Sequence, residues 1–242
     1  VGTGLNADIN YIQRVVEVLS EVTGFSFFQC EDLVDGTRNL DSFVYLSSIL
    51  KTCAVNLSKT ANDIRLMSSG PKAGIAELIL PQEQPGSSIM PGKVNPVIPE
   101  VMNQVCFQIF GNDVTITKAA EAGQLELNVF EPVLFFNLFQ SIQILTNGIR
   151  TFIDNCIAGI QVNEEDCKYW LTRSVGVVTA LSPHIGYKVA AEIAKLSLKT
   201  GKPVYDLVLE QGLLEKEKLD IILNPFEMTK PGLAGKELLK HD

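Results

Sequence analysis

Residues 97–120 read VIPEVMNQVCFQIFGNDVTITKAA, and this stretch indicates the architecture of the chain. Its apolar side chains form two adjacent rows with a spacing of four residues, which places both rows on one side of a helix. A helix of this length with so broad an apolar side needs other helices to cover it. The two rows are Val97, Val101, Val105, Ile109 and Ile98, Met102, Cys106, Phe110.

Long helical patterns lie on both sides of this stretch. Residues 39–68 carry apolar side chains at mixed spacings, mostly of three to five, and end before a Gly-Pro pair. Residues 127–155 form another long pattern, with Pro132 in its first turns, where proline is tolerated. Three such helices predict an elongated bundle. A further helix is expected over 6–23, stopped by Gly24, and a loop is expected between it and the helix at 39.

The pattern after residue 160 is that of shorter, capped helices. Asn163 is typical of an N-cap, and three acidic residues follow it. Ser182 and Pro183 are expected to open another helix, residues 213–223 form a further short one, and residues 224–242 read as a tail.

These patterns predict an all-α fold with two parts. The first is an elongated central helix-bundle portion over 1–160 that contains a loop at 85–96, and the second is a small helical C-terminal domain over 161–242. The segment 75–80 is the one strand-like stretch.

Composition excludes several functions. The net charge is −8 and there is no run of lysine or arginine, which argues against nucleic acid as a partner. The five cysteines form no CxxC pair, and only two histidines occur, so we expect buried thiols in a reducing, cytoplasmic compartment and no metal or other cofactor. Residues 132–149 carry no charge, but their amide side chains argue against a membrane span. The first residues resemble the middle of a longer chain, so a fragment is expected.

The loop over 86–96 reads GSSIMPGKVNP. Lys93 and Asn95 together could hold a carboxylate beside the helix that Pro96 introduces, where backbone N–H groups also favour anions. An exposed connector has the same composition, so composition alone leaves both readings open. A Ser-His-Asp nucleophile does not fit, because the loop has no histidine and no Gly-x-Ser-x-Gly turn.

Along its whole length this loop resembles the signature loop of the aspartase/fumarase superfamily. Further segments resemble family landmarks in the family order. The Met-Pro-Gly-Lys-Val-Asn form resembles the fumarase and aspartase branch, and the segments 97–104 and 120–128 resemble aspartate ammonia-lyases. The other landmarks are Gly-Thr-Gly-Leu-Asn at 2–6, Ala-Asn-Asp-Ile-Arg at 61–65, Gly-Asn-Asp at 111–113 and Pro-His-Ile-Gly-Tyr at 183–187.

The resemblance implies a reversible anti elimination that converts L-aspartate to fumarate and ammonia. It implies that Ser87 is the general base, that Ser88 donates to the β-carboxylate, and that Lys93 and Asn95 bind the α-carboxylate. Glu100 corresponds to an acid that supports a histidine of another subunit, although a solvated helix acid is an equal reading.

The resemblance also implies a homotetramer whose sites combine three segments from three subunits. Only the loop segment occurs in this chain, so the chain alone is expected to be inactive. There are two alternatives. One is a class II fumarase that acts on malate, and the other is a structural relative without catalysis, comparable to the lens crystallins.

Other conspicuous residues receive structural interpretations. His184 follows a proline and is expected to be structural, and Arg65 is expected to pair with acids on a helix face. The larger aromatic side chains are expected in the core, namely Trp170, Phe130, Phe135, Phe136 and Phe139.

Overall fold

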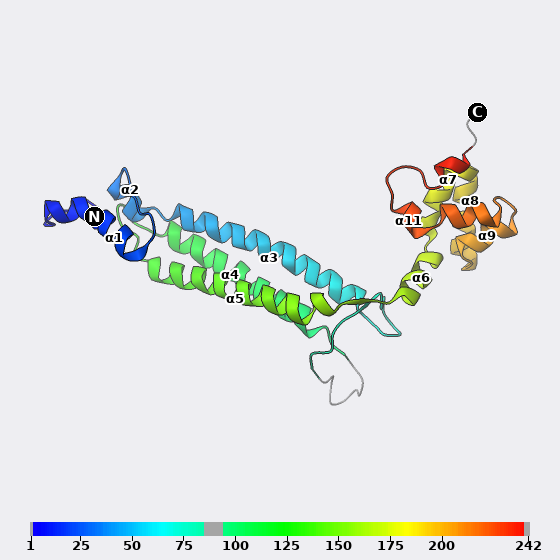
Figure 1. The fold of residues 1–242 in the computed structure, drawn as a ribbon, viewed down its shortest axis with the longest axis horizontal. Helices are drawn as coiled ribbons and strands as arrows, with labels where there is room; N and C mark the ends of the chain where they lie inside the picture. The colour runs from blue at the N-terminus through cyan, green and yellow to red at the C-terminus, as the bar shows by residue number, and fades with distance from the viewer. Residues whose placement is uncertain (1, 85–93, 240–242) are drawn as a thin grey trace. The chain divides into compact units, whose positions relative to one another are not determined.

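The computed structural model of the chain describes residues 2–84 and 94–239 (Figure 1). The chain divides into two compact units, of which unit 1 comprises Val1–Gly74 and Leu80–Gln161. Unit 2 comprises Ile75–Ile79 and Val162–Asp242. The regular structure of the described residues is helical apart from one small sheet, so the all-α prediction is confirmed.

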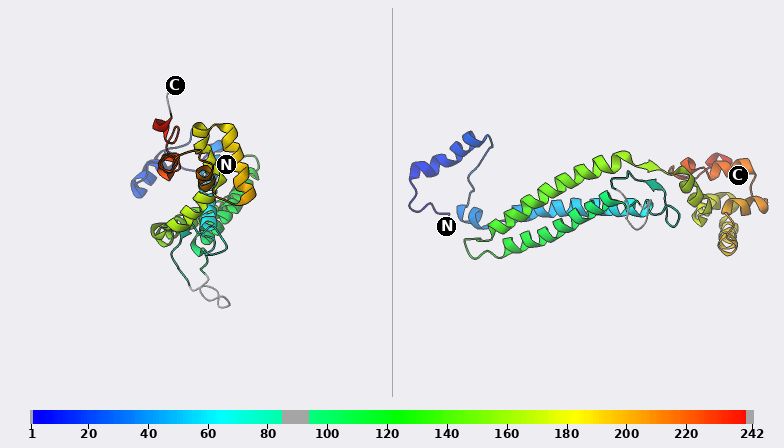
Figure 2. Two further views of the ribbon diagram at one scale, coloured as in Figure 1. Left: turned by 90° about the vertical axis from the view of Figure 1, so that its right-hand side faces the viewer. Right: turned by 90° about the horizontal axis from the view of Figure 1, so that it is seen from below.

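Unit 1 is built on three long helices, α3 (Asp41–Met67), α4 (Val97–Glu121) and α5 (Glu131–Asn155). They lie side by side in Figure 1 and in the right-hand view of Figure 2, and each contacts the other two. The helices predicted over 39–68 and 97–120 are confirmed, with ends that differ by at most two residues. In the part of the chain that the structure describes, no helix is long and apolar enough to cross a membrane.

The second apolar row of α4, together with Ile109, lies at the centre of this bundle, whereas Val101 of the first row is 43% exposed. Met102, Cys106, Ile109 and Ile116 are each at most 1% exposed. Burying such side chains stabilises the fold by roughly 1.5–3 kcal/mol each. Gly148 on α5 allows the close packing, because a Cβ atom there would lie 3.3 Å from Val105 Cγ1. The buried residues around α4 come from the other two helices, α3 and α5: Ala54, Ala61, Ile64, Leu134, Leu138, Leu145 and Phe152.

A buried amide joins α4 to α5. Asn112 is 1% exposed, and its Nδ2 donates to Ser141 Oγ at 2.9 Å and to Gln140 Oε1 at 3.0 Å. Its Oδ1 accepts a hydrogen bond of 2.8 Å from Gln108 Nε2. Buried polar groups stabilise a fold only when they are paired, and this one is paired on both sides.

Replacing Asn112 by alanine is expected to lower the free energy of unfolding by about 3 kcal/mol, because buried partners lose their bonds and a small cavity remains. The measurement is urea unfolding followed by circular dichroism. Asn137→Ala is the matched control, since the half-buried Asn137 side chain donates to Val133 O on its own helix and to no described residue of α4. Equal destabilisation by the two variants would show that the Asn112 network contributes nothing.

The long helix predicted over 127–155 is present, but α5 begins four residues later than the predicted start. Asn128 is buried, and its Nδ2 donates to Ala119 O at 2.9 Å and Ala120 O at 3.1 Å. Its Oδ1 accepts a hydrogen bond of 2.8 Å from Phe130 N. One side chain thus satisfies carbonyl groups at the end of α4 and holds the turn that precedes α5.

The N-terminal part of unit 1 forms α1 (Ile9–Thr23) and α2 (Leu33–Arg38). Asp8 caps α1 through a 2.8 Å hydrogen bond, and Gly24 ends it with φ of 75°, as predicted. A loop is predicted up to residue 39, but its last part, over 33–38, forms the helix α2. Asp32 accepts hydrogen bonds from two backbone N–H groups and so starts α2.

Unit 2 is a group of short helices around a separate core. Strand β1 (Leu78–Ile79), inside the predicted strand-like segment, pairs with β2 (Gln161–Val162). The helices are α6 (Glu164–Arg173), α7 (Val178–Ile185), α8 (Tyr187–Thr200), α9 (Val204–Glu210), α10 (Lys216–Ile222) and α11 (Pro225–Met228). Single 3-10 turns in unit 2 are η2 (Val175–Val177) and η3 (Lys236–Leu238), while η1 (Ile157–Gly159) follows α5 in unit 1. The core residues include Leu181, Ile193, Val204, Val208, Leu219 and Ile222.

Two predictions in unit 2 are wrong. Pro183 lies inside α7 and does not open a helix, because proline removes only one backbone donor and the helix stops shortly afterwards at Gly186, with φ of 80°. The tail expected over 224–242 contains α11, which Asn224 caps, and Leu238 packs against the unit 2 core. The N-cap predicted at Asn163 is confirmed.

The aromatic side chains expected in the core are mostly at the surface. Phe136 is 65% and Phe139 is 63% exposed, and Phe130 and Trp170 are also exposed. Phe135 is half-buried and packs edge-on against Phe43 at a centroid distance of 4.8 Å. The prediction failed because α5 is apolar on more than one side, and only one side can face α3 and α4.

Candidate functional site

The described candidate residues gather where α3 ends and α4 begins. Asn95 lies two residues before α4, and Glu100 lies in its first turn. Both side chains are half-buried, and the Asn95 carbonyl accepts a 2.8 Å hydrogen bond from Val97 N. Three further predicted residues, Ser87, Ser88 and Lys93, lie outside the described residues.

The start of α4 leaves one backbone donor for an anion. Among the described residues no side chain caps this helix, but Val97 N–H donates to Asn95 O, Glu100 N–H donates to Pro96 O, and Pro99 has no N–H. Ile98 N–H is left to attract a carboxylate, and Asn95 adds an amide three residues before it.

Arg65 brings a positive charge to the same end of the bundle. Its Nη2 lies 3.9 Å from Glu100 Oε1, and its Nη1 donates to Asn103 Oδ1 at 3.2 Å and to Asn62 Oδ1 at 3.3 Å. The expectation that Arg65 pairs with an acid on a helix face is met, but the acid lies on the neighbouring helix α4. Side chains of Arg65 and Glu100 are each 40% exposed, and such pairs contribute only about 0–1 kcal/mol to stability.

Asn103 and Ser58 complete this polar cluster and were not recognised from the sequence. Asn103 is 3% exposed, and its Nδ2 donates to Ser58 O at 3.1 Å and Ser58 Oγ at 3.0 Å. The signal that could have found Asn103 is its position among the apolar rows of 97–120, where an amide is costly unless it is bonded.

Cys106, which hydrogen-bonds to Ser58 of this cluster, has an unreactive thiol. Burial raises the pKa of the Cys106 thiol to about 11, a neighbouring negative charge on Cys53 adds to this, and a hydrogen bond with Ser58 opposes it. The thiol is therefore protonated near neutral pH and is a poor nucleophile. The expectation of buried thiols is correct for Cys106 and Cys156 and wrong for Cys30, which is exposed.

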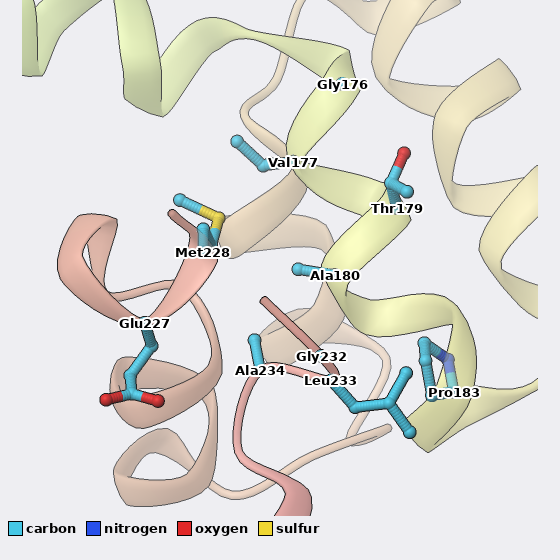
Figure 3. A pocket seen from close by; sticks show the side chains of 10 residues that line it. All are labelled: Gly176, Val177, Thr179, Ala180, Pro183, Glu227, Met228, Gly232, Leu233 and Ala234. Atoms are coloured by element: carbon cyan, nitrogen blue, oxygen red, sulfur yellow. The ribbon is translucent and has the colours of Figure 1, made fainter. Parts of the chain in front are cut away.

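A separate cavity of about 330 Å³ lies in unit 2 (Figure 3). Its one ionisable side chain is Glu227, which is paired with Lys230. His184 is not among the residues that line the cavity; its Nε2 lies 2.8 Å from Ala234 O, and the ring ties the C-terminal segment to α7. The other residues lining the cavity are small or apolar, apart from Thr179: Gly176, Val177, Ala180, Pro183, Met228, Gly232, Leu233 and Ala234. This cavity therefore lacks the groups that catalysis requires.

The described part of the chain contains no cluster of metal-binding side chains. No group of three or more histidine, cysteine, aspartate or glutamate side chains among those residues could hold an ion. The polar cluster at Arg65 is built from one cation, one acid and neutral amides and hydroxyls.

Comparison with known proteins gives two family matches. A family model described as "Lyase" matches residues 1–111, and one described as "Fumarase C C-terminus" matches residues 177–230. The aspartate ammonia-lyase of Bacillus subtilis is 58% identical over 240 residues, which cover 99% of this chain and 50% of that protein. The chain thus spans about half the length of the curated relatives that it matches.

Two solved structures are similar in fold. One is described as a fumarate lyase:delta crystallin from Brucella melitensis bound to cobalt, with a TM-score of 0.89, 45% identity, and coverage of 96% of this chain and 50% of that chain. The other is a recombinant class II fumarase from Schistosoma mansoni, with a TM-score of 0.86, 37% identity, and coverage of 96% and 51%.

Proposed function

Because the chain belongs to the aspartase/fumarase superfamily of lyases, we propose that the protein is an aspartate ammonia-lyase. It converts L-aspartate reversibly to fumarate and ammonia. The observation that carries the choice of aspartate is the high identity to curated proteins named for that activity. The identity to the class II fumarase is lower.

The loop over 86–96 supplies the chemistry in this proposal. Ser87, as an alkoxide, removes a proton from Cβ, and the electron pair left behind is held on the β-carboxylate as an aci-carboxylate. That pair then forms the Cα–Cβ double bond, while the C–N bond breaks and its electrons leave with ammonia. A serine hydroxyl is a very weak acid, so nearby backbone N–H groups and the Lys93 ammonium must stabilise the alkoxide.

The remaining loop residues stabilise charge. Ser88 donates to the β-carboxylate, where negative charge increases during proton removal. Lys93 and Asn95 bind the α-carboxylate, and Ile98 N–H, the one first-turn donor of α4 that no described acceptor bonds, supports Asn95 in that role. Glu100 supports a histidine that another subunit brings to the site.

We infer that the protein assembles as a homotetramer. Nine large apolar side chains on the three bundle helices are at least 49% exposed in the single chain, and copies of the chain would cover them. A mass of four subunits by light scattering would support this assembly, and a stable monomer would contradict it. The nine are Tyr45, Ile49, Val55, Leu66, Phe107, Val114, Phe136, Phe139 and Ile153.

A cytoplasmic location fits the proposal. All five cysteines are free thiols, which is typical of proteins in a reducing compartment.

The experiment that tests the proposed function is an assay of the full-length enzyme with L-aspartate. We expect release of ammonia and fumarate in equal amounts. A protein that folds and assembles but releases neither product from L-aspartate would be a fumarase or a structural relative, as the similarity to the two solved structures allows.

A further inference from the structure

The guanidinium group of Arg65 is fixed from its buried side. Nη1 donates to two amide oxygens, those of Asn103 and Asn62, and Nη2 faces the carboxylate of Glu100. Within the described part of the chain, the buried Nε–H has no hydrogen-bond partner. A buried donor without a partner is costly, so this arginine is held where stability alone would not place it.

The orientation of the Asn103 amide is determined by its partners. Ser58 O can only accept a hydrogen bond, so the group facing it must be Nδ2, which also donates to Ser58 Oγ. Oδ1 therefore faces Arg65. Turning the amide over would bring two donors together at Arg65 and two acceptors together at Ser58. The buried amide thus holds the cation in one position.

Glu100 stands at the outer end of this chain of contacts. The 3.9 Å separation from Arg65 Nη2 is too long for a hydrogen bond, so the two groups attract each other by charge alone. Only Oε1 faces the arginine in this pair, and the carboxylate is 40% exposed. The other oxygen remains able to accept a hydrogen bond from a donor that approaches the start of α4.

We propose that Arg65 is a positioning residue, which acts through Glu100 and is itself held by Asn103 and Ser58. It keeps the Glu100 carboxylate at the start of α4 with one oxygen directed to the donor that completes the site. This inference rests on the proposed function, because Glu100 matters for turnover only if the start of α4 belongs to the active site. Arg65 does not touch the substrate in this account.

The test is a double-mutant cycle on the full-length enzyme with Arg65→Gln, Glu100→Gln and the combined variant. Misplacing a catalytic group lowers kcat by roughly ten- to a hundredfold, and we expect a loss of that size in Arg65→Gln with KM changed less than about twofold. Because Arg65 acts through Glu100, the combined variant should be no slower than Glu100→Gln. Arg65→Lys keeps the charge without the planar fork and should restore part of the loss.

Lys59→Gln is the matched control. It removes another ion pair of α3, the one between Lys59 and Asp63, and should leave kcat unchanged. Circular dichroism and subunit mass are compared for every variant to detect loss of folding. If Arg65→Gln does not fold, the kcat of Arg65→Lys is measured in its place. A wild-type kcat in Arg65→Gln, or losses that multiply in the combined variant, would overturn the proposal.

The cycle is measured with whichever of L-aspartate and L-malate the full-length enzyme turns over. An error in the proposed substrate would appear in the wild-type enzyme as turnover of malate. An error in the role of Arg65 would appear only in the comparison of the variants. The two failures are therefore distinguishable.

Discussion

Ser87→Ala in the full-length enzyme is expected to lower kcat by about a hundred- to ten-thousandfold, with the fold and subunit mass unchanged. The Cβ proton of aspartate is not acidic, so its removal depends on a positioned base, and alanine offers none. Binding of L-aspartate should change little, because the carboxylate-binding groups at Ser88, Lys93 and Asn95 remain. The measurement is steady-state turnover of L-aspartate beside circular dichroism and light scattering.

The matched control for this prediction is Ser48→Ala. Ser48 lies on α3, and its hydroxyl donates to Tyr45 O at 2.7 Å on the same helix. The control should therefore keep wild-type turnover. A Ser87→Ala enzyme as fast as the control would mean that another group removes the proton.

The isolated 242-residue chain is expected to show no turnover of L-aspartate. The proposed site needs donors on all sides of the developing charge, and the chain contributes only the loop over 86–96 and the start of α4 to it. The chain also spans about half the length of the curated relatives, and the resemblance implies that other segments complete each site. The measurement is fumarate absorbance in the presence of aspartate.

The control for the isolated chain is the full-length enzyme at the same molar concentration. Circular dichroism must show that the isolated chain is helical, since an unfolded chain would be inactive for another reason. Formation of fumarate by the folded, isolated chain would contradict the shared site.

The long helices could be predicted from the sequence because their apolar spacing repeats over many turns. The ends depend on single side chains and were less predictable. The start of α5 depends on Asn128, whose amide bonds back to the end of α4 and has no pattern in the local sequence. The helix α2 is six residues long, too short for a period to show, although Asp32 is a recognisable cap.

Part of the candidate site could likewise be predicted from the sequence, and part could not. The loop over 86–96 could be recognised because its residues are consecutive, and it stays a prediction at Ser87, Ser88 and Lys93. The pairing of Arg65 with Asn103 joins residues 38 positions apart, and it depends on how α3 and α4 are turned toward each other. The spacing of apolar residues shows which side of each helix is buried. It does not fix the rotation of α3 and α4 about their axes precisely enough to say which two side chains meet.

The measurement that tests the account most directly compares kcat/KM of the full-length enzyme for L-aspartate and for L-malate in the same assay of fumarate formation. The account predicts measurable turnover of L-aspartate, with ammonia released in equal amount, and none of L-malate above background. Turnover of L-malate without turnover of L-aspartate would contradict it and would assign the loop over 86–96 to a fumarase.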